Sequence, residues 1–128
     1  MSVVCAEQPL YIVLCASGFE NEDRMRSALM FASLAASAEY RTILYCIQNA
    51  VDVMVKGAVG KHEVPVPGLP SISQRLREAM EMGVEIQCCT QTMANRKISP
   101  DDLIAGVKPA GAMSLIELTT RAKGTLSF

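Results

Sequence analysis

The first third of the chain alternates between two hydrophobic periods. Residues 10–16 (LYIVLCA) are almost entirely apolar, which is typical of a strand buried on both faces of a parallel sheet. Residues 20–40 show a helical period behind an acidic first turn, and residues 42–47 (TILYCI) return to strand character. The apolar positions of the helical stretch are Met25, Leu29, Ala32 and Ala36. Together these segments predict a β-α-β unit with a right-handed crossover.

The middle of the chain carries two helical patterns separated by a loop. Residues 49–59 predict a short helix, and residues 61–70 (KHEVPVPGLP) contain three prolines and a glycine, which indicates an irregular loop. Ser71 and Gln74 then fit the S-x-x-Q capping box at the start of a helix. Gly83 is a natural end for this helix.

A third strand and another helix follow. In residues 84–89 (VEIQCC) polar and apolar residues alternate, so one face of this strand is partly polar. The strand therefore flanks the sheet or faces another subunit. Ser99, followed by a proline and two aspartates, predicts a second well-marked helix that ends at Gly106.

The C-terminal part predicts one more helix and a strand. Residues 112–123 fit a helix with Leu115, Ile116 and Thr119 facing inward, and the chain finishes on TLSF, a short terminal strand. Strands alternate with helices throughout. We therefore predict one α/β domain over residues 1–128, with three α/β/α layers and a mainly parallel sheet of four to five strands.

Composition narrows the function classes. Half of the 128 residues are hydrophobic, a fifth are charged and the formal net charge is −1, as in an ordinary globular protein. No basic face with interleaved aromatic residues is present, so nucleic acid is not an expected partner. No apolar run approaches the ~18–20 residues that span a bilayer. The first ten residues (MSVVCAEQPL) lack the basic and apolar regions of a secretory signal, so we expect a cytoplasmic protein without membrane contact.

Sulfur is the expected chemical agent. The five cysteines are odd in number and unevenly spaced, which argues against a disulfide framework. The sequence contains no C-x-x-C motif, which argues against a structural zinc site and a thioredoxin-type redox pair. His62 is the single histidine, so the sequence lacks most of the residues that a His-based metal site or a catalytic triad requires. A lone loop histidine is usually solvated. We therefore expect no metal and no organic cofactor.

Each of the three strong strands ends in cysteine. Cys15 closes the first, Cys46 the second, and Cys88 and Cys89 the third. Ligand and catalytic positions in such sheets gather beyond the carboxyl ends of the strands. Free cysteine also packs as a small hydrophobe, which is the favoured interpretation for Cys15 and Cys46 inside their apolar runs. Cys5 receives no role.

The cysteine pair at the end of the third strand has two different environments. Strand alternation places Cys88 on the same face as Val84 and Ile86, and sends Cys89 to the opposite side or into the turn. The polar residues after Cys89 can form a helical turn, whose N-terminus would stabilise a thiolate. Arg96 and Lys97 can add positive potential if the turn folds back; otherwise they are surface charges. From spacing alone, Cys89 can equally be a nucleophile or a packed thiol.

The order of motifs resembles the DsrE/DsrF-like family of small sulfur-relay proteins. The resemblance runs from SALMFASLAAS and TILYCI through GVEIQCC, RKI, the S-P-D-D-L helix and GV to TLSF. It implies an α/β protein of the cytoplasm that forms trimers or hexamers. Active members carry sulfur as a persulfide on one cysteine, in a pattern close to C-x(6–7)-R-G-[IV]. Cys89 fits this place with Ile98 nine residues on, and Cys88 lies one residue too early; Lys97 replaces the expected glycine.

On this resemblance we expect a sulfurtransferase of the carrier type. Cys89 would accept sulfane sulfur from a rhodanese-like or TusA-like protein, or from a small persulfide or thiosulfate, and pass it to an acceptor thiol. Cys88 would shield or resolve the persulfide. Two alternatives remain open: a non-catalytic oligomeric subunit that only docks partners, and a phosphate- or nucleotide-binding domain. The last ranks lowest, because the loop ASGFENED is acidic and lacks both G-x-G-x-x-G and a P-loop.

Overall fold

The structure, a computed structural model, describes residues 8–128. Strands and helices alternate along the chain, as the hydrophobic periods predict. In chain order, with η for a 3₁₀ helix, the elements are β1 (Leu10–Cys15), η1 (Phe19–Asn21), α1 (Glu22–Ser37), β2 (Arg41–Cys46), α2 (Asn49–Val53), α3 (Ala58–His62), α4 (Ile72–Glu81), β3 (Glu85–Cys89), α5 (Thr90–Asn95), η2 (Pro100–Asp102), β4 (Lys108–Ala110), α6 (Ala112–Arg121) and β5 (Gly124–Ser127).

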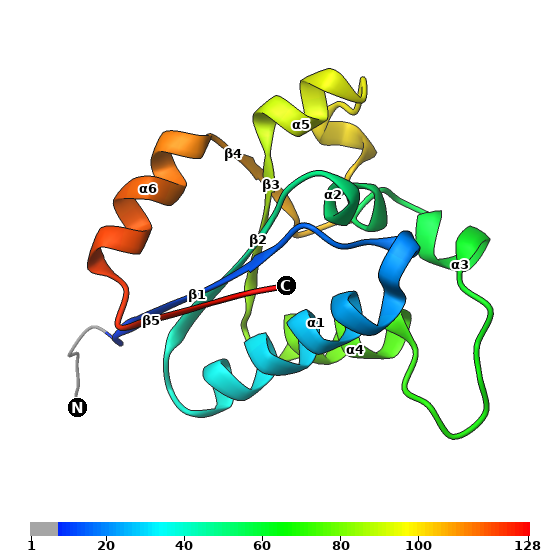
Figure 1. The fold of residues 1–128 in the computed structure, drawn as a ribbon, viewed down its shortest axis with the longest axis horizontal. Helices are drawn as coiled ribbons and strands as arrows, with labels where there is room; N and C mark the ends of the chain where they lie inside the picture. Colours follow the sequence, from blue (N-terminus) through cyan, green and yellow to red (C-terminus); the bar gives the residue numbers. More distant parts are fainter. Residues whose placement is uncertain (1–7) are drawn as a thin grey trace.

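Within the described residues, five parallel strands form one sheet in the order β4-β3-β2-β1-β5. Helices α1 and α4 lie side by side on one face, and α6 lies on the other (Figure 1). The predicted three-layer α/β/α fold is therefore confirmed. The larger core fills the space between the sheet and α1 and α4, and it includes fully buried Met25, Leu29 and Ala32 at the predicted positions on α1.

Helix α6 joins the two edges of the sheet, since β4 precedes it and β5 follows it. It therefore crosses the sheet as the helix of the second face (Figure 1). Leu115, Leu118 and Ala122 pack on this face, at a spacing that makes one narrow stripe. The prediction that Ile116 faces inward is wrong: its side chain is 54% exposed, because a single helix on an open face buries only this stripe.

The predicted helix from Ser99 to Gly106 is also wrong beyond its first turn. The Ser99–Asp102 capping box forms, but only the 3₁₀ turn η2 follows it. Leu103 then takes an extended conformation, is buried, and pairs with Val55 in an antiparallel bridge. Burial of Leu103 outweighs the local helix signal. A turn closed by the Val107 N–H on the Ile104 carbonyl oxygen then leads to the edge strand β4, which the sequence did not reveal.

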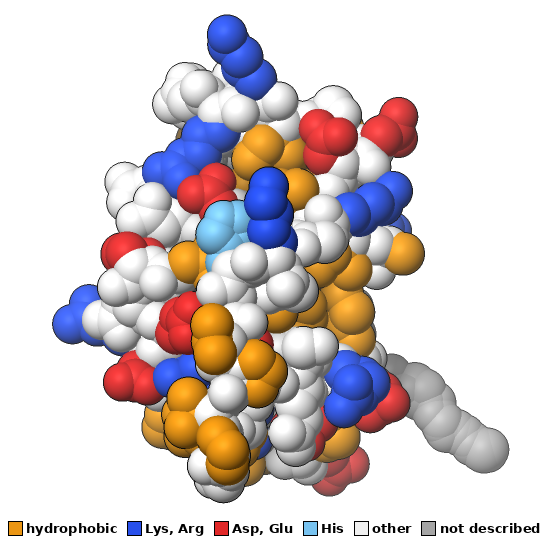
Figure 2. All heavy atoms as spheres, turned by 90° about the vertical axis from the view of Figure 1, so that its right-hand side faces the viewer, with side chains coloured by type: hydrophobic (Ala, Val, Ile, Leu, Met, Phe, Trp, Pro, Cys, Tyr) orange, Lys and Arg blue, Asp and Glu red, His pale blue; other side chains and the backbone are white. Residues whose placement is uncertain are grey.

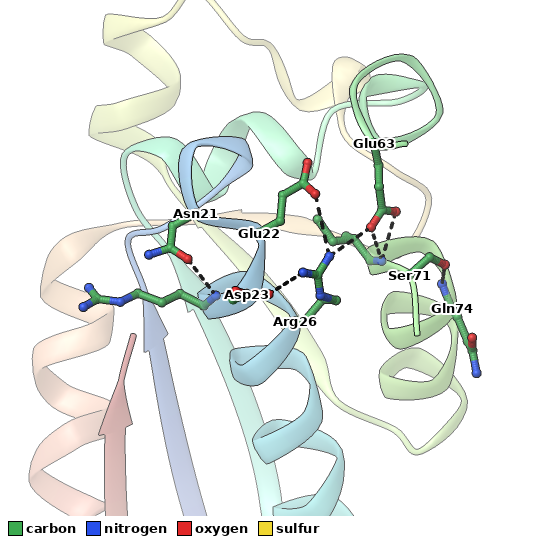
Figure 3. A network of polar contacts seen from close by, with 9 residues as sticks. Asn21, Glu22, Asp23, Arg26, Glu63, Ser71 and Gln74 are labelled. Atoms are coloured by element: carbon green, nitrogen blue, oxygen red, sulfur yellow. Dashed lines mark hydrogen bonds and ion pairs between the residues drawn. The ribbon is translucent and has the colours of Figure 1, made fainter. Parts of the chain in front are cut away.

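A carboxylate network ties the loop before α4 to α1 (Figure 3). The Glu63 side chain is buried and accepts the Ile72 N–H at 2.8 Å, while Arg26 Nη1 of α1 lies 3.4 Å from it. Arg26 also contacts Asp23 on its own helix. The predicted cap of α4 is present, since Ser71 Oγ accepts the Gln74 N–H at 3.0 Å. Glu63 thus supplies an anion at the helix N-terminus, beside the neutral Ser71 cap, where the unpaired amides and the dipole favour it.

The loop that carries Glu63 also exposes apolar side chains. Val64, Val66 and Leu69 all remain exposed, and Figure 2 shows apolar side chains gathered on the face of the molecule that carries α3. The predicted short helix of residues 49–59 divides into α2 and the start of α3. His62, at the end of α3, stacks on Phe19 with 4.6 Å between ring centroids. This arrangement is a surface packing contact.

Gly18 allows the loop after β1 to touch the start of α2. A β-carbon on Gly18 would lie 2.1 Å from the Asn49 carbonyl oxygen, far inside van der Waals contact. The main chain itself would have to move to accommodate any larger residue. The close approach of β1 and β2 loops at the carboxyl edge of the sheet thus depends on this glycine.

We predict that Gly18→Ala lowers the free energy of unfolding by about 1–3 kcal/mol, the usual cost of overpacking against groups that cannot give way. Urea denaturation measures the change. Gly60→Ala is the matched control, because a β-carbon there meets nothing within 4 Å and Gly60 lies inside α3. The control should be neutral or stabilising by up to about 1 kcal/mol. Equal stability of Gly18→Ala and the control would contradict the close-contact argument.

Candidate functional site

Three cysteines form a row across the three central strands of the sheet, at their carboxyl ends. Cys15 of β1 is in register with Cys46 of β2, and Cys46 is in register with Cys88 of β3. All three side chains are fully buried in the core under α1 and α4. Their thiols are enclosed between the sheet and the helices.

This environment disfavours the thiolate form. Burial raises the pKa of Cys15 to about 11. A hydrogen bond with Cys88, followed by burial, raises the pKa of Cys46 well above its ordinary value. The packing interpretation of Cys15 and Cys46 therefore agrees with the structure, and these protonated core thiols are poor nucleophiles. Cys5 lies outside the described residues.

Cys89 lies at the junction of β3 and α5. It pairs with Ala110 of β4, and it is also the N-cap residue of α5, which begins at Thr90. Strand alternation points it away from the face of Cys88 and toward the face of Tyr45, as the pairing of Tyr45 with Gln87 shows. Two adjacent thiols thus belong to opposite sides of the sheet.

Hydrogen-bond donors converge on the Cys89 sulfur from β2 and α5. Burial raises the pKa of Cys89, but hydrogen bonds from the Thr92 amide, the Tyr45 hydroxyl, the Gln91 amide and the Thr92 hydroxyl outweigh burial and leave it below the ordinary value. Cys89 makes no side-chain capping hydrogen bond at the start of α5, so the first-turn amides lower its pKa by their proximity to the sulfur. The site therefore favours a thiolate at position 89.

Tyr45 connects Cys89 to the edge strand. Its ring is almost completely buried, and its hydroxyl donates to the Ala110 carbonyl oxygen at 2.9 Å. Burial, followed by the hydrogen bond with Cys89, raises the pKa of Tyr45 far above its ordinary value. The phenol stays protonated, so it acts as a donor near the thiol. Its single proton has two acceptors, the Ala110 oxygen and the sulfur.

Access to the sulfur is narrow. The Cys89 residue is 7% exposed, whereas Thr90 and Gln91 beside it are exposed. Its surroundings include hydroxyl and amide groups as well as apolar atoms. A reagent must therefore reach the sulfur at the surface turn where β3 becomes α5.

Of the two cations after α5, Arg96 is held by α2, and Lys97 has an unusual backbone conformation. The Arg96 guanidinium is held by Asp52 and by Asn49 Oδ1, both from α2, the latter at 3.0 Å. Lys97 has φ of +57°, the left-handed conformation that glycine adopts most easily. Lys97 therefore keeps the backbone turn that the family pattern's glycine would make, at some cost in strain.

Residues 8–128 contain neither a cluster of metal-ligating side chains nor a helix that could span a membrane. No group of three His, Cys, Asp or Glu side chains in this part of the chain could hold a metal ion. In the same range, no helix is long and apolar enough to cross a membrane. The His62 ring contacts Phe19 and the Ala58 carbonyl oxygen, far along the chain from Cys89.

Sequence reasoning did not identify Tyr45 or Thr92. Tyr45 is hidden in an apolar strand, and its phenol has a polar task only because β2 lies beside β3. Thr92 offered a weak signal, as the hydroxyl residue three positions after a potential helix cap. The structure brings both to Cys89.

Comparison with known proteins identifies the family and the fold of the chain. The model of the DsrE/DsrF-like family matches residues 10–128. The chain is 25% identical over 118 residues to the uncharacterized protein MJ0989 of Methanocaldococcus jannaschii, covering 92% of this chain and 98% of that protein.

Solved structures share the fold. The ychN protein from E. coli has a TM-score of 0.75 and 24% sequence identity, with 94% of this chain and 99% of that chain covered. The protein of unknown function MTH1491 from Methanobacterium thermoautotrophicum has a TM-score of 0.70 and 15% identity, with 95% and 100% covered. At these identities the likeness establishes the fold alone.

We predict that Cys89 is alkylated by iodoacetamide before the described core thiols. The thiolate reacts, so the rate should rise with pH and reach half its maximum below pH 9.0, the ordinary cysteine value, because the pKa of Cys89 is lowered. Cys15 and Cys46 should react only after denaturant is added. Tandem mass spectrometry assigns each adduct to its residue. Labelling of Cys15 or Cys46 at the same rate as Cys89 in the native protein would contradict the prediction.

Proposed function

This chain belongs to the DsrE/DsrF-like family, and we propose that Cys89 carries sulfane sulfur as a persulfide between a donor and an acceptor thiol. The observation that supports this role is the set of donors from β2 and α5 that lowers the pKa of Cys89. The family assignment supports a sulfur-relay role more generally. Donor and acceptor are thiol proteins, such as rhodanese-like or TusA-like proteins, or small persulfides.

The transfer is a thiolate displacement at sulfur. The Cys89 thiolate attacks the outer sulfur of a donor persulfide R–S–SH, a new S–S bond forms, and the donor S–S bond breaks. The products are Cys89–S–SH and the donor thiolate R–S⁻, so charge is conserved and no external oxidant is consumed. With thiosulfate the leaving group is sulfite. An acceptor thiolate then repeats the step on the outer sulfur of Cys89.

Cys88 takes a packing role in this proposal. It lies in the closed core on the other side of the sheet, in contact with Cys46. A resolving thiol must reach the persulfide, and the strand itself separates Cys88 from the side that Cys89 faces. The carrier function therefore needs Cys89 alone, with the Tyr45 phenol and the turn around Thr92 as its environment.

A non-catalytic subunit is the second candidate, and the 7% exposure of Cys89 favours it. In that case the thiol would only cap α5, and the exposed apolar surfaces would serve partner docking. The two candidates differ in one property, the ability of the sulfur at position 89 to take up another sulfur atom.

We predict that incubation with thiosulfate, polysulfide or a small persulfide adds the mass of one sulfur atom to the protein, and that tetrathionate adds a thiosulfonate group with thiosulfate as the leaving group. Intact mass spectrometry measures the adduct. Cys89→Ser should abolish it, because the nucleophile is lost. Cys88→Ala should keep it, because that thiol is in the core and alanine leaves no unpaired hydroxyl there.

The control is the same adduct after treatment with dithiothreitol, which should release the added sulfur. No adduct with any of the donors would favour the docking subunit. An adduct that persists in Cys89→Ser and disappears in Cys88→Ala would show that the carrier is the neighbouring thiol.

We further propose a cytoplasmic homo-oligomer, a trimer or hexamer. Exposed apolar side chains on α6 and β5, namely Met113, Ile116 and Leu126, support self-association, because large exposed apolar groups commonly mark protein interfaces. Sedimentation velocity at micromolar concentration should show a species of at least three chains. A monomer under these conditions would contradict this part of the proposal.

A further inference from the structure

The turn between β2 and α2 has an unusual backbone. Gln48, which follows the strand by two residues, has φ of +49° and ψ of −126°. This combination is rarely adopted by residues with a side chain and costs free energy. The Gln48 side chain is exposed, so its burial does not offset that cost. We therefore expect the main-chain hydrogen bonds of Gln48 to supply the interactions that stabilise this conformation.

The main chain at Gln48 is connected to the Cys89 site. Its N–H donates to Thr92 Oγ1 at 3.1 Å, although the two residues are 44 positions apart. Two nearby amides have other acceptors: Ile47 donates to the Cys15 carbonyl oxygen at 2.9 Å, and Ala50, two residues after Gln48, donates to the Ile47 carbonyl oxygen at 3.1 Å. Gln48 is therefore the amide of this turn that reaches α5.

The Gln48 amide restricts where the Thr92 hydroxyl hydrogen can point. A hydroxyl has one hydrogen to donate, and an N–H bound at its oxygen occupies an acceptor position. Thr92 is the third residue after Cys89, the N-cap residue of α5, and its hydroxyl is one of the groups that lower the pKa of Cys89. With Gln48 on the acceptor side, the Thr92 hydrogen is free to point toward the sulfur. The Tyr45 hydroxyl differs, because its hydrogen is shared with the Ala110 carbonyl oxygen.

We propose that Gln48 is a positioning residue of the Cys89 site, whose strained turn holds its main-chain N–H on Thr92 and so directs the Thr92 hydroxyl hydrogen to the sulfur. The purpose of this arrangement rests on the proposed carrier function. The hydrogen-bonded chain itself concerns the free thiol, before any sulfur is bound.

The neighbouring charged and titratable groups are independent of this chain of hydrogen bonds. Tyr45 faces Cys89 from β2, and Lys108 stands on β4 in register with Gln87, on the same face. Arg96 at the end of α5 is bound to α2. Changes at positions 48 and 92 leave these groups in place, so a change in thiol reactivity reports the hydrogen bonds.

The test removes the Gln48 N–H without changing the fold around it. Nonsense suppression with an α-hydroxy acid at position 48 replaces the amide N–H with an ester oxygen, in a Gln48→Ala background. The matched control carries the same ester at Ala50, whose N–H bonds inside its own turn. The rate of Cys89 alkylation by iodoacetamide is measured from pH 6 to pH 10 in the folded proteins.

The ester at position 48 should slow alkylation at neutral pH about three- to tenfold, the effect of losing one hydrogen bond between neutral groups, and should move the pH profile upward. The Gln48→Ala protein and the Ala50 ester should behave like the natural chain. Thr92→Val should slow alkylation to a similar extent, and Thr92→Ser should restore the natural profile. In a Thr92→Val protein the ester should have no additional effect.

Three results would overturn the proposal: an unchanged profile with the ester at position 48, an equal effect of Gln48→Ala alone, or an ester effect that persists in Thr92→Val. Iodoacetamide needs no sulfur donor. A failure here therefore leaves the persulfide proposal standing, and absence of a persulfide leaves this hydrogen-bonded chain standing.

Discussion

The site depends on the way one parallel strand ends. β3 passes directly into α5 at Cys89, so strand alternation and the start of a helix act on adjacent residues. Strand alternation places the Cys88 side chain in the closed core. The helix start places the free amides of the first turn of α5 near the Cys89 sulfur. The two thiols have the same intrinsic chemistry. Their different environments follow from a shift of one residue along the chain.

Stabilising the sulfur needs groups that are distant in sequence. The amides come from α5, next to Cys89 in sequence, but the Tyr45 phenol comes from β2, and its hydroxyl also donates to the Ala110 carbonyl oxygen of β4. These groups meet because parallel strands present their carboxyl ends at one edge. Burial alone would raise the pKa of Cys89, as it does for Cys15. The donors reverse that effect at one thiol of the described four. Low exposure and an acidic thiol are therefore compatible here.

Local signals predicted what local interactions stabilise. The β-α-β unit, the Ser71 cap and the separation of Cys88 from Cys89 follow from hydrophobic period and capping, and each is present. The roles of Glu63 and Tyr45 could not be predicted from the sequence, because tertiary packing brings their partners to them. Glu63 meets Ile72 and Arg26, and Tyr45 meets Ala110 and Cys89. At Leu103 a local signal fails: Ser99 starts a helical turn, but burial of the Leu103 side chain stabilises an extended chain instead of a longer helix. The prediction that Ile116 faces the core was wrong, because α6 packs alone on its side of the sheet and leaves this side chain exposed.

The narrow access to Cys89 has a consequence for the proposed carrier. A persulfide has two sulfur atoms about 2 Å apart, and the outer one extends away from the protein relative to Cys89 Sγ. Attack by an acceptor on the outer atom transfers sulfur, whereas attack on Sγ releases sulfide and leaves a mixed disulfide. Enclosure of Sγ by Tyr45, Thr92 and the first turn of α5 blocks the second route more than the first. Low exposure of the thiol, which argues against a general-purpose nucleophile, thus suits a group whose cargo must be taken from its outer end.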